Sequence, residues 1–220
     1  MALPKMDKNK FFANIIKRQA RGRLEEFRQY TLEIESKFNS DKNALSSSYD
    51  ETIKGLSADE IREIDDYFSD DYYIIEEIHV GMYRKSTLVS IYSFLENSMY
   101  GLCRYLSARH DYPVKLYDLR GEGIVRAKDY LEKLARVDFD ALNGEWSHLM
   151  TLNKIRNCIV HSEGDIKASR NSHIGNIITN NASLSLRNER YIKIDRKYVD
   201  FSINKVEEFL DKLYQQVLSS

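Results

Sequence analysis

The sequence predicts a mainly α-helical protein that forms a single domain over residues 1–220. It contains only two prolines and nine glycines, the residues that most often interrupt helices and mark turns. Apolar residues make up 42% of the chain and charged residues 30%, a balance that is typical of a globular domain with one hydrophobic core. Several long segments also repeat apolar residues every three or four positions, which is the period of one helix face. We therefore expect an all-α bundle of long helices.

The first quarter of the chain is expected to be a helix followed by a loop. Its opening segment mixes aromatic and aliphatic residues with charged ones, which indicates a folded helix. Residues 38–57 are rich in Ser, Asn and Asp and lack apolar periodicity, so we expect a connecting loop there. Ser57 is followed by Glu60, the capping-box pattern of a helix start. Residues 1–56 are thus interpreted as an N-terminal helical extension and loop, and residues 57–220 as the helical core.

A long helix is predicted from Ser57 to about Ala108, with a bend near Gly81. Its second half carries one continuous apolar face, because its apolar residues are separated by three or four positions. These residues are Leu88, Ile91, Leu95, Met99, Leu102 and Leu106. A stripe of this kind faces the core of a helical protein. Pro113 follows the stripe and is expected to separate this helix from those after it.

Two shorter helices, a β-hairpin and a closing helix are predicted after this proline. The expected elements are a helix at 121–139, a helix from near 140 or 143 to 162, a loop or short helix at 165–181, a hairpin at 183–195 and a helix at 199–217. Gly164 stands where a glycine commonly ends a helix. The hairpin prediction depends on the alternation of apolar and polar residues on both sides of Arg187-Asn188-Glu189. The closing helix again has apolar residues three or four positions apart.

Charge is unevenly distributed along the chain, although the net charge is only −1. Residues 5–28 hold eight basic and three acidic residues, whereas residues 50–77 hold eleven acidic and two basic ones. Either these helices present complementary faces to each other or to solvent, or the basic segment is an arm that touches RNA or a partner. The near-neutral total excludes a protein that coats nucleic acid, so any anion site must be local.

Most catalytic and metal-binding templates are absent from the sequence. We find no GxGxxG, P-loop, HExxH, GxSxG or EF-hand pattern, and the five histidines have no paired metal-ligand spacing, so we expect no metal and no cofactor. Cys103 and Cys158 are the only cysteines, and we expect small buried side chains rather than a disulfide. Without a membrane-spanning apolar run or a signal-peptide core, we expect a cytoplasmic protein and no membrane partner.

One polar cluster, Lys154–His161, combines groups that suit a phosphate diester. Arg156 offers a planar fork of donors, Asn157 both donates and accepts hydrogen bonds, and histidine side chains titrate near neutrality. Asn157 and His161 are four residues apart and share a helix face. Arg156 lies about 140° from His161 around the helix, so it reaches the same place only by its long side chain or if the helix tightens. The spacing fits equally a solvent-facing polar edge beside a core stripe.

The stretch IRNCIVHSEG resembles the R-x4-6-H signature of the HEPN superfamily, in the form with Asn directly after Arg. The long helix with RKSTLVSIYSFLENSMYGLCRYL is similar to the HEPN helix that precedes the motif. Trp146 and the closing amphipathic helix are similar to those of bacterial HEPN-like proteins. The resemblance extends from about Met82 to Val217. It implies a HEPN-like helical bundle, a fold whose active members are metal-independent ribonucleases.

The resemblance also implies roles for the motif residues. His161 would act in proton transfer as an RNA 2′-hydroxyl attacks the adjacent phosphate, and Arg156 would stabilise charge on the phosphoryl oxygens. Asn157 would orient groups within the site. The expected products carry a 2′,3′-cyclic phosphate and a 5′-hydroxyl. Cleavage needs both an acid and a base, yet each chain has one motif histidine. The resemblance to the HEPN superfamily implies a homodimer, which would bring the motifs of two chains into one cleft.

Four further residues are candidates for this site. Glu96 lies at the edge of the apolar stripe, and we expect its carboxylate to hold the Arg156 guanidinium; an ordinary exposed glutamate is the alternative. Lys154, Lys167 and Arg170 flank the motif and are candidates for RNA binding through backbone phosphates.

Glu163 stands where some HEPN toxins carry the tyrosine that a nucleotidyltransferase antitoxin modifies, which argues against regulation of that kind. The leading hypothesis is a cytoplasmic HEPN-like endoribonuclease in a defence or toxin–antitoxin setting. It would be a homodimer with RNA as its substrate and a protein antitoxin or regulator as a further partner. The alternatives are an inactive HEPN-like scaffold or ligand-binding protein, and a plain helical interaction module.

Overall fold

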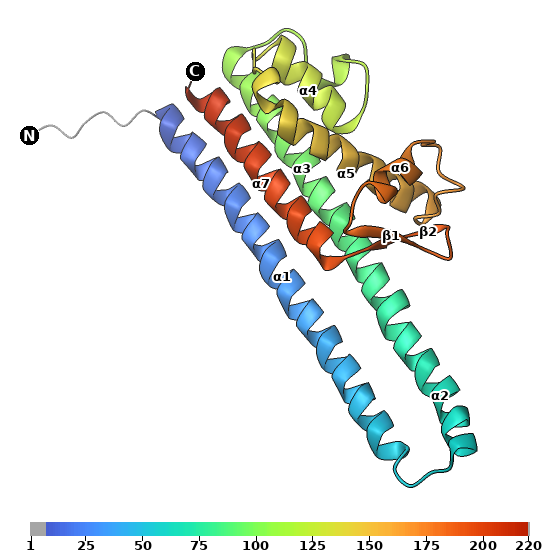
Figure 1. Cartoon of the computed structure of the whole chain (residues 1–220). Coiled ribbons are helices and arrows are strands. Elements are labelled where there is room, and N and C mark those ends of the chain that lie inside the picture. The colour runs from blue at the N-terminus through green and yellow to red at the C-terminus, as the bar shows by residue number, and fades with distance from the viewer. Residues whose placement is uncertain (1–7, 220) are drawn as a thin grey trace, which may run out of the picture.

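Seven α-helices and one two-stranded hairpin make up residues 8–219, the part of the chain that this computed structural model describes (Figure 1). The helices are α1 (Lys8–Thr52), α2 (Ala58–Tyr73), α3 (Val80–His110), α4 (Gly123–Lys133), α5 (Asn143–Ser162), α6 (Ile174–Thr179) and α7 (Arg196–Ser219). The strands are β1 (Leu184–Arg187) and β2 (Tyr191–Ile194). The predicted mainly α-helical fold, with a small hairpin before the last helix, is confirmed.

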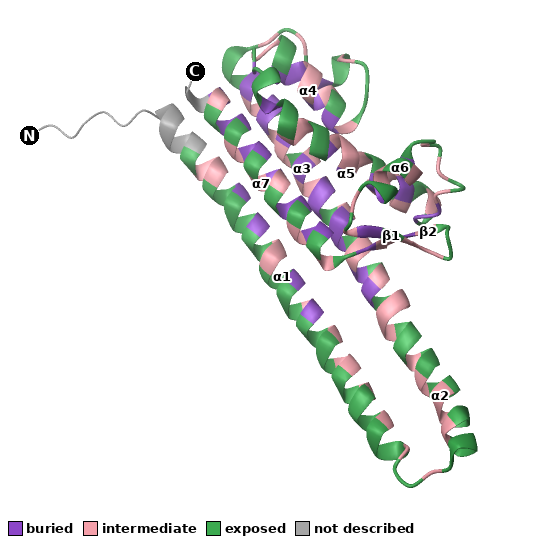
Figure 2. Ribbon diagram, viewed as in Figure 1, coloured by how far each residue is buried: buried purple, intermediate pink, exposed green. Residues whose placement is uncertain are grey.

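The hydrophobic core lies where α3 meets α4, α5 and α7, in the upper half of the molecule as drawn in Figure 2. Each residue of the predicted α3 stripe is at most 3% exposed. The apolar face predicted for the closing helix is buried in the same core, from Val199 to Val217. Burying such faces stabilises the fold by about 25 cal/mol per Å² of apolar surface. Helical periodicity therefore identifies both central helices.

The first helix is much longer than the sequence predicts, because it runs through the expected loop. The segment 38–57 is helical as far as Thr52, so the loop prediction is wrong, and only five residues connect α1 to α2. Packing between the two helices explains the difference. The Tyr49 ring of α1 lies 5.3 Å from the Phe68 ring of α2, edge to face. Such contacts outweigh the weak helix preference of Ser, Asn and Asp, which costs at most about 0.7 kcal/mol per residue.

The start of α2 matches the predicted capping box. The backbone N–H of Ser57 donates to a Glu60 carboxylate oxygen at 2.9 Å, and the Ser57 hydroxyl donates to the same oxygen at 2.7 Å. The predicted long helix continues from α2 into α3 through a π-helical segment, Ile74–His79. The irregularity therefore precedes Gly81, the expected position of a bend.

α4 ends at Lys133 rather than near residue 139, where the sequence predicts its end. Arg136 adopts a left-handed conformation with φ 54°, and the N–H of Val137 turns back to the Leu131 carbonyl at 3.1 Å. A left-handed residue after the last turn is a common way for a helix to stop. α5 then begins at one of the two predicted starts.

The β-hairpin forms in the predicted place, and α6 is the short helix expected before it. The strands are antiparallel, with Leu184 opposite Ile194. Asn188 and Glu189 in the turn have φ values of 51° and 53°, as in a type I′ turn, which matches the twist of a hairpin.

The basic residues of α1 pair with acidic residues of α7. Arg21 binds Asp211, and Arg28 binds Glu207. Among the described side chains of α1, only Lys42 forms an ion pair with the acidic segment that includes α2. Charge complementarity is thus present, but the main partner of the basic helix is α7. The first residues of the basic segment lie outside the described residues.

Both cysteines are buried and free, as the sequence indicates. Cys103 lies in α3 and Cys158 in α5. Within residues 8–219, no helix combines the length and apolar character needed to cross a lipid bilayer.

Candidate functional site

The last turn of α5 follows Arg156 and Asn157 of the motif. It is held in place by a buried residue on its inner face and by the backbone turn at its end. Cys158 is buried towards the core. Glu163 and Gly164 then adopt φ values of 54° and 84°, and the N–H of Gly164 returns to the Cys158 carbonyl at 3.0 Å. Lys85 of α3 donates to the Glu163 carbonyl at 3.3 Å, and burial lowers the pKa of Lys85. The motif-bearing helix end is thereby held against α3.

A cleft of about 640 Å³ opens between the C-terminal half of α5 and the segment before α6. It is lined by four of the predicted site residues, Lys154, Asn157, His161 and Arg170. The other lining residues are small or polar: Cys158, Ser162, Ala168, Ser169 and Asn171. In the described part of the chain, no carboxylate lines this cleft. Two cations, an imidazole and two amides therefore surround a space that suits an anion.

The far wall of the cleft is organised by Asp165, the residue after the end of the α5 turn. Its carboxylate accepts hydrogen bonds from the N–H groups of Lys167 and Ala168 at 2.9 and 3.3 Å. Arg190, in the β1–β2 turn, donates to it at 2.8 Å. The Arg190 guanidinium holds the pKa of Asp165 below its usual value. The wall is thus tied to the hairpin as well as to α5.

Arg156 lies beside the cleft rather than in its lining. Its guanidinium carbon is 5.1 Å from the centre of the Tyr92 ring of α3, and its Nη1 donates to the Asn157 side-chain oxygen at 2.8 Å. Its Nε is buried and has no hydrogen-bond partner among the described residues. Burial raises the pKa of Tyr92 to about 12, with a smaller contribution from the negative charge of Glu96. Asn157 therefore links the arginine to the cleft.

Two predicted site residues lie apart from the cleft. Glu96 is half-buried in α3 and forms no ion pair with Arg156 among the described residues. The expected contact is wrong because Arg156 stacks on Tyr92, one turn earlier in α3. Lys167 is exposed, and it contributes a backbone N–H to the Asp165 turn rather than a side chain to the cleft lining. The predicted role of Lys167 in holding RNA has no support in this geometry.

The cleft offers one accessible group for proton transfer. His161 is exposed at the end of α5 and lines the cleft. Cys158 also lines it, but burial raises the pKa of its thiol, so it is not a thiolate nucleophile at neutral pH. Across the described residues, no group of three or more His, Cys, Asp or Glu side chains could hold a metal ion.

Sequence reasoning missed Tyr92, which orients the motif arginine. The available signal is its position four residues before Glu96 in the same helix, the spacing at which side chains share a face. It also missed Ser169 and Asn171, whose polar side chains reach the cleft only through the fold of the segment before α6. Neither a protein-family model nor a curated protein nor a solved structure matches this chain.

Proposed function

We propose that this chain is a metal-independent endoribonuclease of the HEPN type, acting in the cytoplasm in a defence or toxin–antitoxin setting. The observation that carries the proposal is the cleft at the end of α5. His161 and Asn157 face the same space as Lys154 and Arg170. A phosphodiester needs cationic groups to hold its oxygens and an imidazole to move a proton. The lining provides both.

The proposed reaction moves one proton at each end of the broken bond. A base removes the proton of a ribose 2′-hydroxyl, whose oxygen attacks the adjacent phosphorus. The bond from phosphorus to the 5′-oxygen breaks, and an acid supplies the proton that this oxygen takes up. The products are a 2′,3′-cyclic phosphate and a 5′-hydroxyl. His161 acts as the base or the acid, and the charge on the phosphoryl oxygens is offset by nearby cations.

A second copy of the chain would supply the other histidine. Val160 is 45% exposed, and at 100° per residue it lies between Arg156 and Asn157 on the surface of α5. An apolar residue at this point suits a contact between two α5 helices around a two-fold axis. Such a contact brings both copies of His161 towards one cleft, and it places Arg156 beside the substrate of the partner.

Cleavage of single-stranded RNA in the presence of EDTA tests the proposal. The wild-type chain should produce 2′,3′-cyclic phosphate ends, and His161→Ala should lower the rate by about 100-fold or more, since acid–base catalysis contributes that much. Arg156→Ala should also lose activity. His148→Ala is the matched control, because His148 is exposed on the same helix but packs on Phe201, outside the cleft. Absence of cleavage, or activity that survives both His161→Ala and Arg156→Ala, would refute the nuclease.

Mixing wild-type chains with the His161→Ala variant tests the shared cleft separately. After subunit exchange at equal amounts, a site that needs both histidines leaves about one quarter of the dimers active. Independent sites leave about one half of the activity. The second result would retain the nuclease but reject the composite site.

A second candidate function is a non-catalytic HEPN-like module that binds a ligand or protein. The position of Arg156 favours it, because Tyr92 and Asn157 hold the guanidinium outside the cleft lining. This candidate predicts RNA or anion binding that Lys154 and Arg170 support, with no bond cleavage under any condition tested. The cleavage assay with its end-group analysis separates the two candidates.

A further inference from the structure

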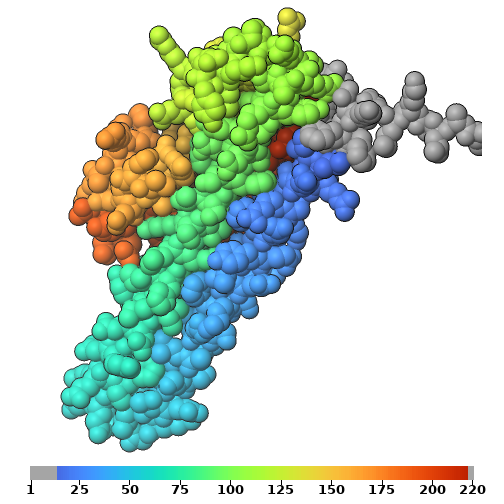
Figure 3. Space-filling view, turned by 180° about the vertical axis from the view of Figure 1, so that it is seen from behind, coloured from blue at the N-terminus to red at the C-terminus, as the bar shows by residue number. Residues whose placement is uncertain are grey.

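The second half of α1, together with α2 and the π-helical segment, forms an arm that projects beyond the rest of the molecule (Figure 1). We call residues 36–79 the helical hairpin. None of its side chains is buried, whereas buried residues fill the region around α3, α5 and α7 (Figure 2). Figure 3 shows the same narrow arm from behind. Two helices alone cannot enclose an apolar face, but a third helix laid along them can.

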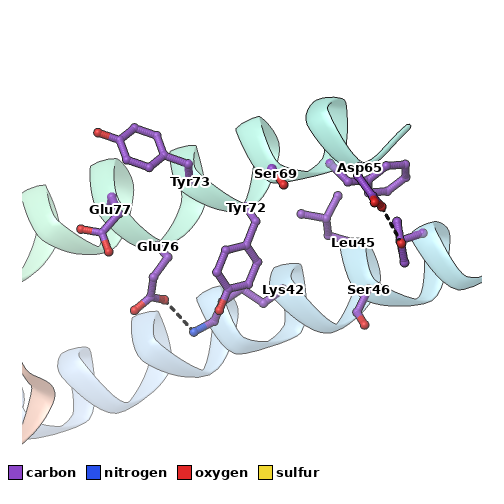
Figure 4. Close-up of a pocket in the computed structure, with 11 residues that line it drawn as sticks. Lys42, Leu45, Ser46, Asp65, Ser69, Tyr72, Tyr73, Glu76 and Glu77 are labelled. Atoms are coloured by element: carbon purple, nitrogen blue, oxygen red, sulfur yellow. Dashed lines mark hydrogen bonds and ion pairs between the residues drawn. The ribbon is translucent and has the colours of Figure 1, made fainter. Parts of the chain in front are cut away.

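A groove of about 680 Å³ runs along the helical hairpin between α1 and α2 (Figure 4). Its α1 side starts at Lys42 and its α2 side at Asp65, and both sides continue at the i, i+3, i+4, i+7 spacing of one helix face. The second side continues from α2 through the π-helical segment to Glu77, so the groove is about 18 Å long at the helical rise per residue. Leu45 and Phe68 supply apolar lining. The groove accommodates about three turns of another helix.

Two tyrosines in the groove remain open to solvent. Tyr72 and Tyr73 are 51% and 45% exposed although they line it. Figure 4 shows Tyr72 extending from α2 towards Lys42 of α1. Exposed tyrosines are typical of contact surfaces between proteins, and their rings attract the cations of lysine and arginine. The Arg187 guanidinium already lies 6.0 Å from the centre of the Tyr73 ring, so Tyr72 is the ring that can take a cation from a partner. The groove therefore offers both apolar and cation-binding contacts.

The groove is acidic on its α2 side. Its lining contains Asp65, Glu76 and Glu77 but only one lysine. Asp66 and Asp70 continue the row that includes Tyr73, since they precede it by seven and three residues. In the described part of the chain, neither Asp66 nor Asp70 forms an ion pair. Of the lining carboxylates, Glu76 pairs with Lys42 and Glu77 pairs with Lys193. The negative charge left without an ion pair among the described residues therefore lies on the α2 side, at Asp65, Asp66 and Asp70.

We propose that the helical hairpin binds a basic amphipathic helix from a partner protein in this groove. The partner places apolar residues, spaced i, i+3 or i+4 and i+7, against Leu45 and Phe68, as in other helix-in-groove complexes. Its lysines and arginines lie over Tyr72 and beside Asp66 and Asp70. The bound helix completes a three-helix arrangement and covers the apolar faces that the hairpin leaves half-exposed.

The charge of the groove favours a basic partner helix over two other possible occupants, a second copy of α1 and RNA. The basic part of a second copy of α1 is already engaged, because Arg21 and Arg28 pair with α7. RNA carries a negative charge at each phosphate and is repelled by the carboxylates. The proposal is independent of the nuclease proposal, since the groove shares no lining residue with the cleft at the end of α5.

Binding of two synthetic peptides to the full chain tests the proposal. One is an amphipathic helix of about 18 residues, or five turns, with leucines at helical spacing and lysines and arginines on its flanks. The other has the same leucines with glutamates in place of the cations. Fluorescence anisotropy at physiological salt should show that the basic peptide binds and that the acidic one binds at least about tenfold more weakly. Absence of binding by the basic peptide, or equal binding of both, overturns the proposal.

Variants then locate the site. Tyr72→Ser should weaken binding of the basic peptide by about tenfold or more, as truncation of a central aromatic contact does. Asp66→Asn combined with Asp70→Asn should weaken it by about threefold to tenfold, in line with two partly screened charge pairs. Circular dichroism checks that these exposed changes preserve the helices.

The matched control is Glu33→Gln combined with Glu189→Gln, which removes two exposed carboxylates outside the groove. It should leave peptide affinity within about twofold of wild type. If groove and control variants bind the peptide equally, the binding site lies elsewhere and the proposal fails. It also fails if single-stranded RNA binds the chain more weakly in the groove variants than in the control, because the groove would then be an RNA site.

Discussion

Breaking the buried ion pair between Glu35 of α1 and Arg84 of α3 should strongly destabilise the fold. The two side chains are 5% and 12% exposed. Arg84 Nε and Nη2 donate to the two Glu35 oxygens at 2.7 and 2.8 Å, and Nη1 donates to the Ile194 carbonyl of β2 at 3.1 Å. One guanidinium thus joins the first helix, the third helix and the hairpin, and the turn of that hairpin holds the cleft wall through Arg190.

Replacing Glu35 by alanine removes one partner and leaves the Arg84 charge buried. Breaking a buried pair in this way costs about 3–5 kcal/mol. The two lost hydrogen bonds to a charged group, at about 1.5–3 kcal/mol each, give a similar range. In a chain of this size, each kcal/mol lowers the Tm by about 2–4 °C. The Tm of Glu35→Ala should therefore fall by about 6–20 °C.

Urea unfolding followed by circular dichroism measures this loss. The control is Glu208→Gln, which breaks the more exposed Lys205–Glu208 pair and should change the unfolding free energy by less than about 1 kcal/mol. Glu35→Leu combined with Arg84→Met removes both charges and should recover most of the stability. This double variant should remain less stable than wild type by about 1–3 kcal/mol of unfolding free energy, because the Ile194 carbonyl loses its hydrogen-bond donor. A loss below about 1 kcal/mol in Glu35→Ala, or a double variant no more stable than the single one, would refute this reasoning.

Three further predictions concern the cleft and its surroundings. Gly164→Ala should cost about 1–2 kcal/mol of unfolding free energy, because the residue has φ +84° and a new Cβ would lie 3.3 Å from the Lys85 amine; Gly144→Ala, whose new Cβ meets open space within α5, should be neutral or stabilising in the same urea titration. Asp165 has a lowered pKa because it accepts a hydrogen bond from Arg190, so its stabilising contribution is complete above the unfolded carboxyl pKa of about 3.9 and is lost as the pH falls through the folded value. The stability difference between wild type and Asp165→Asn should therefore be constant from about pH 5 to pH 8 and shrink below about pH 4; a difference that does not change in acid would contradict this. In the proposed dimer, Val160→Asp places two carboxylates at the two-fold contact, so light scattering should show monomers and RNA cleavage should fall about 100-fold; a variant that stays dimeric would remove Val160 from the interface.

The elements that the sequence predicts well are those whose signal is local. The α3 stripe from Leu88 to Leu106 is buried throughout, because a helix that packs on one side must repeat its apolar residues at the helical period. The loop prediction for the end of α1 is wrong for the complementary reason. Its helix depends on contacts such as Tyr49 with Phe68, which join residues that are distant in sequence. Judged by composition alone, this segment resembles a loop, because many of its residues are weak helix formers.

The same distinction between local and long-range signals applies to the candidate site. The four-residue spacing of Asn157 and His161 predicts that they share a face, and both line the cleft. The stacking of Arg156 on Tyr92 joins two helices, so the motif spacing cannot indicate it. Arg170 reaches the cleft because Asp165 folds the intervening turn. Which cation enters the cleft is therefore decided by backbone hydrogen bonds that no motif records.

The near-zero net charge of the chain conceals two cavities of opposite character. The cleft at the end of α5 is lined by Lys154 and Arg170 without a carboxylate, whereas the groove of the helical hairpin is lined by three carboxylates and one lysine. At physiological ionic strength the Debye length is about 8 Å, so each cavity responds mainly to its own lining rather than to the total charge. An anion and a cationic helix can therefore occupy the same chain without competing. If RNA binding at the cleft and peptide binding at the groove prove to be mutually exclusive, the two must be coupled through α3, the helix that contacts both regions.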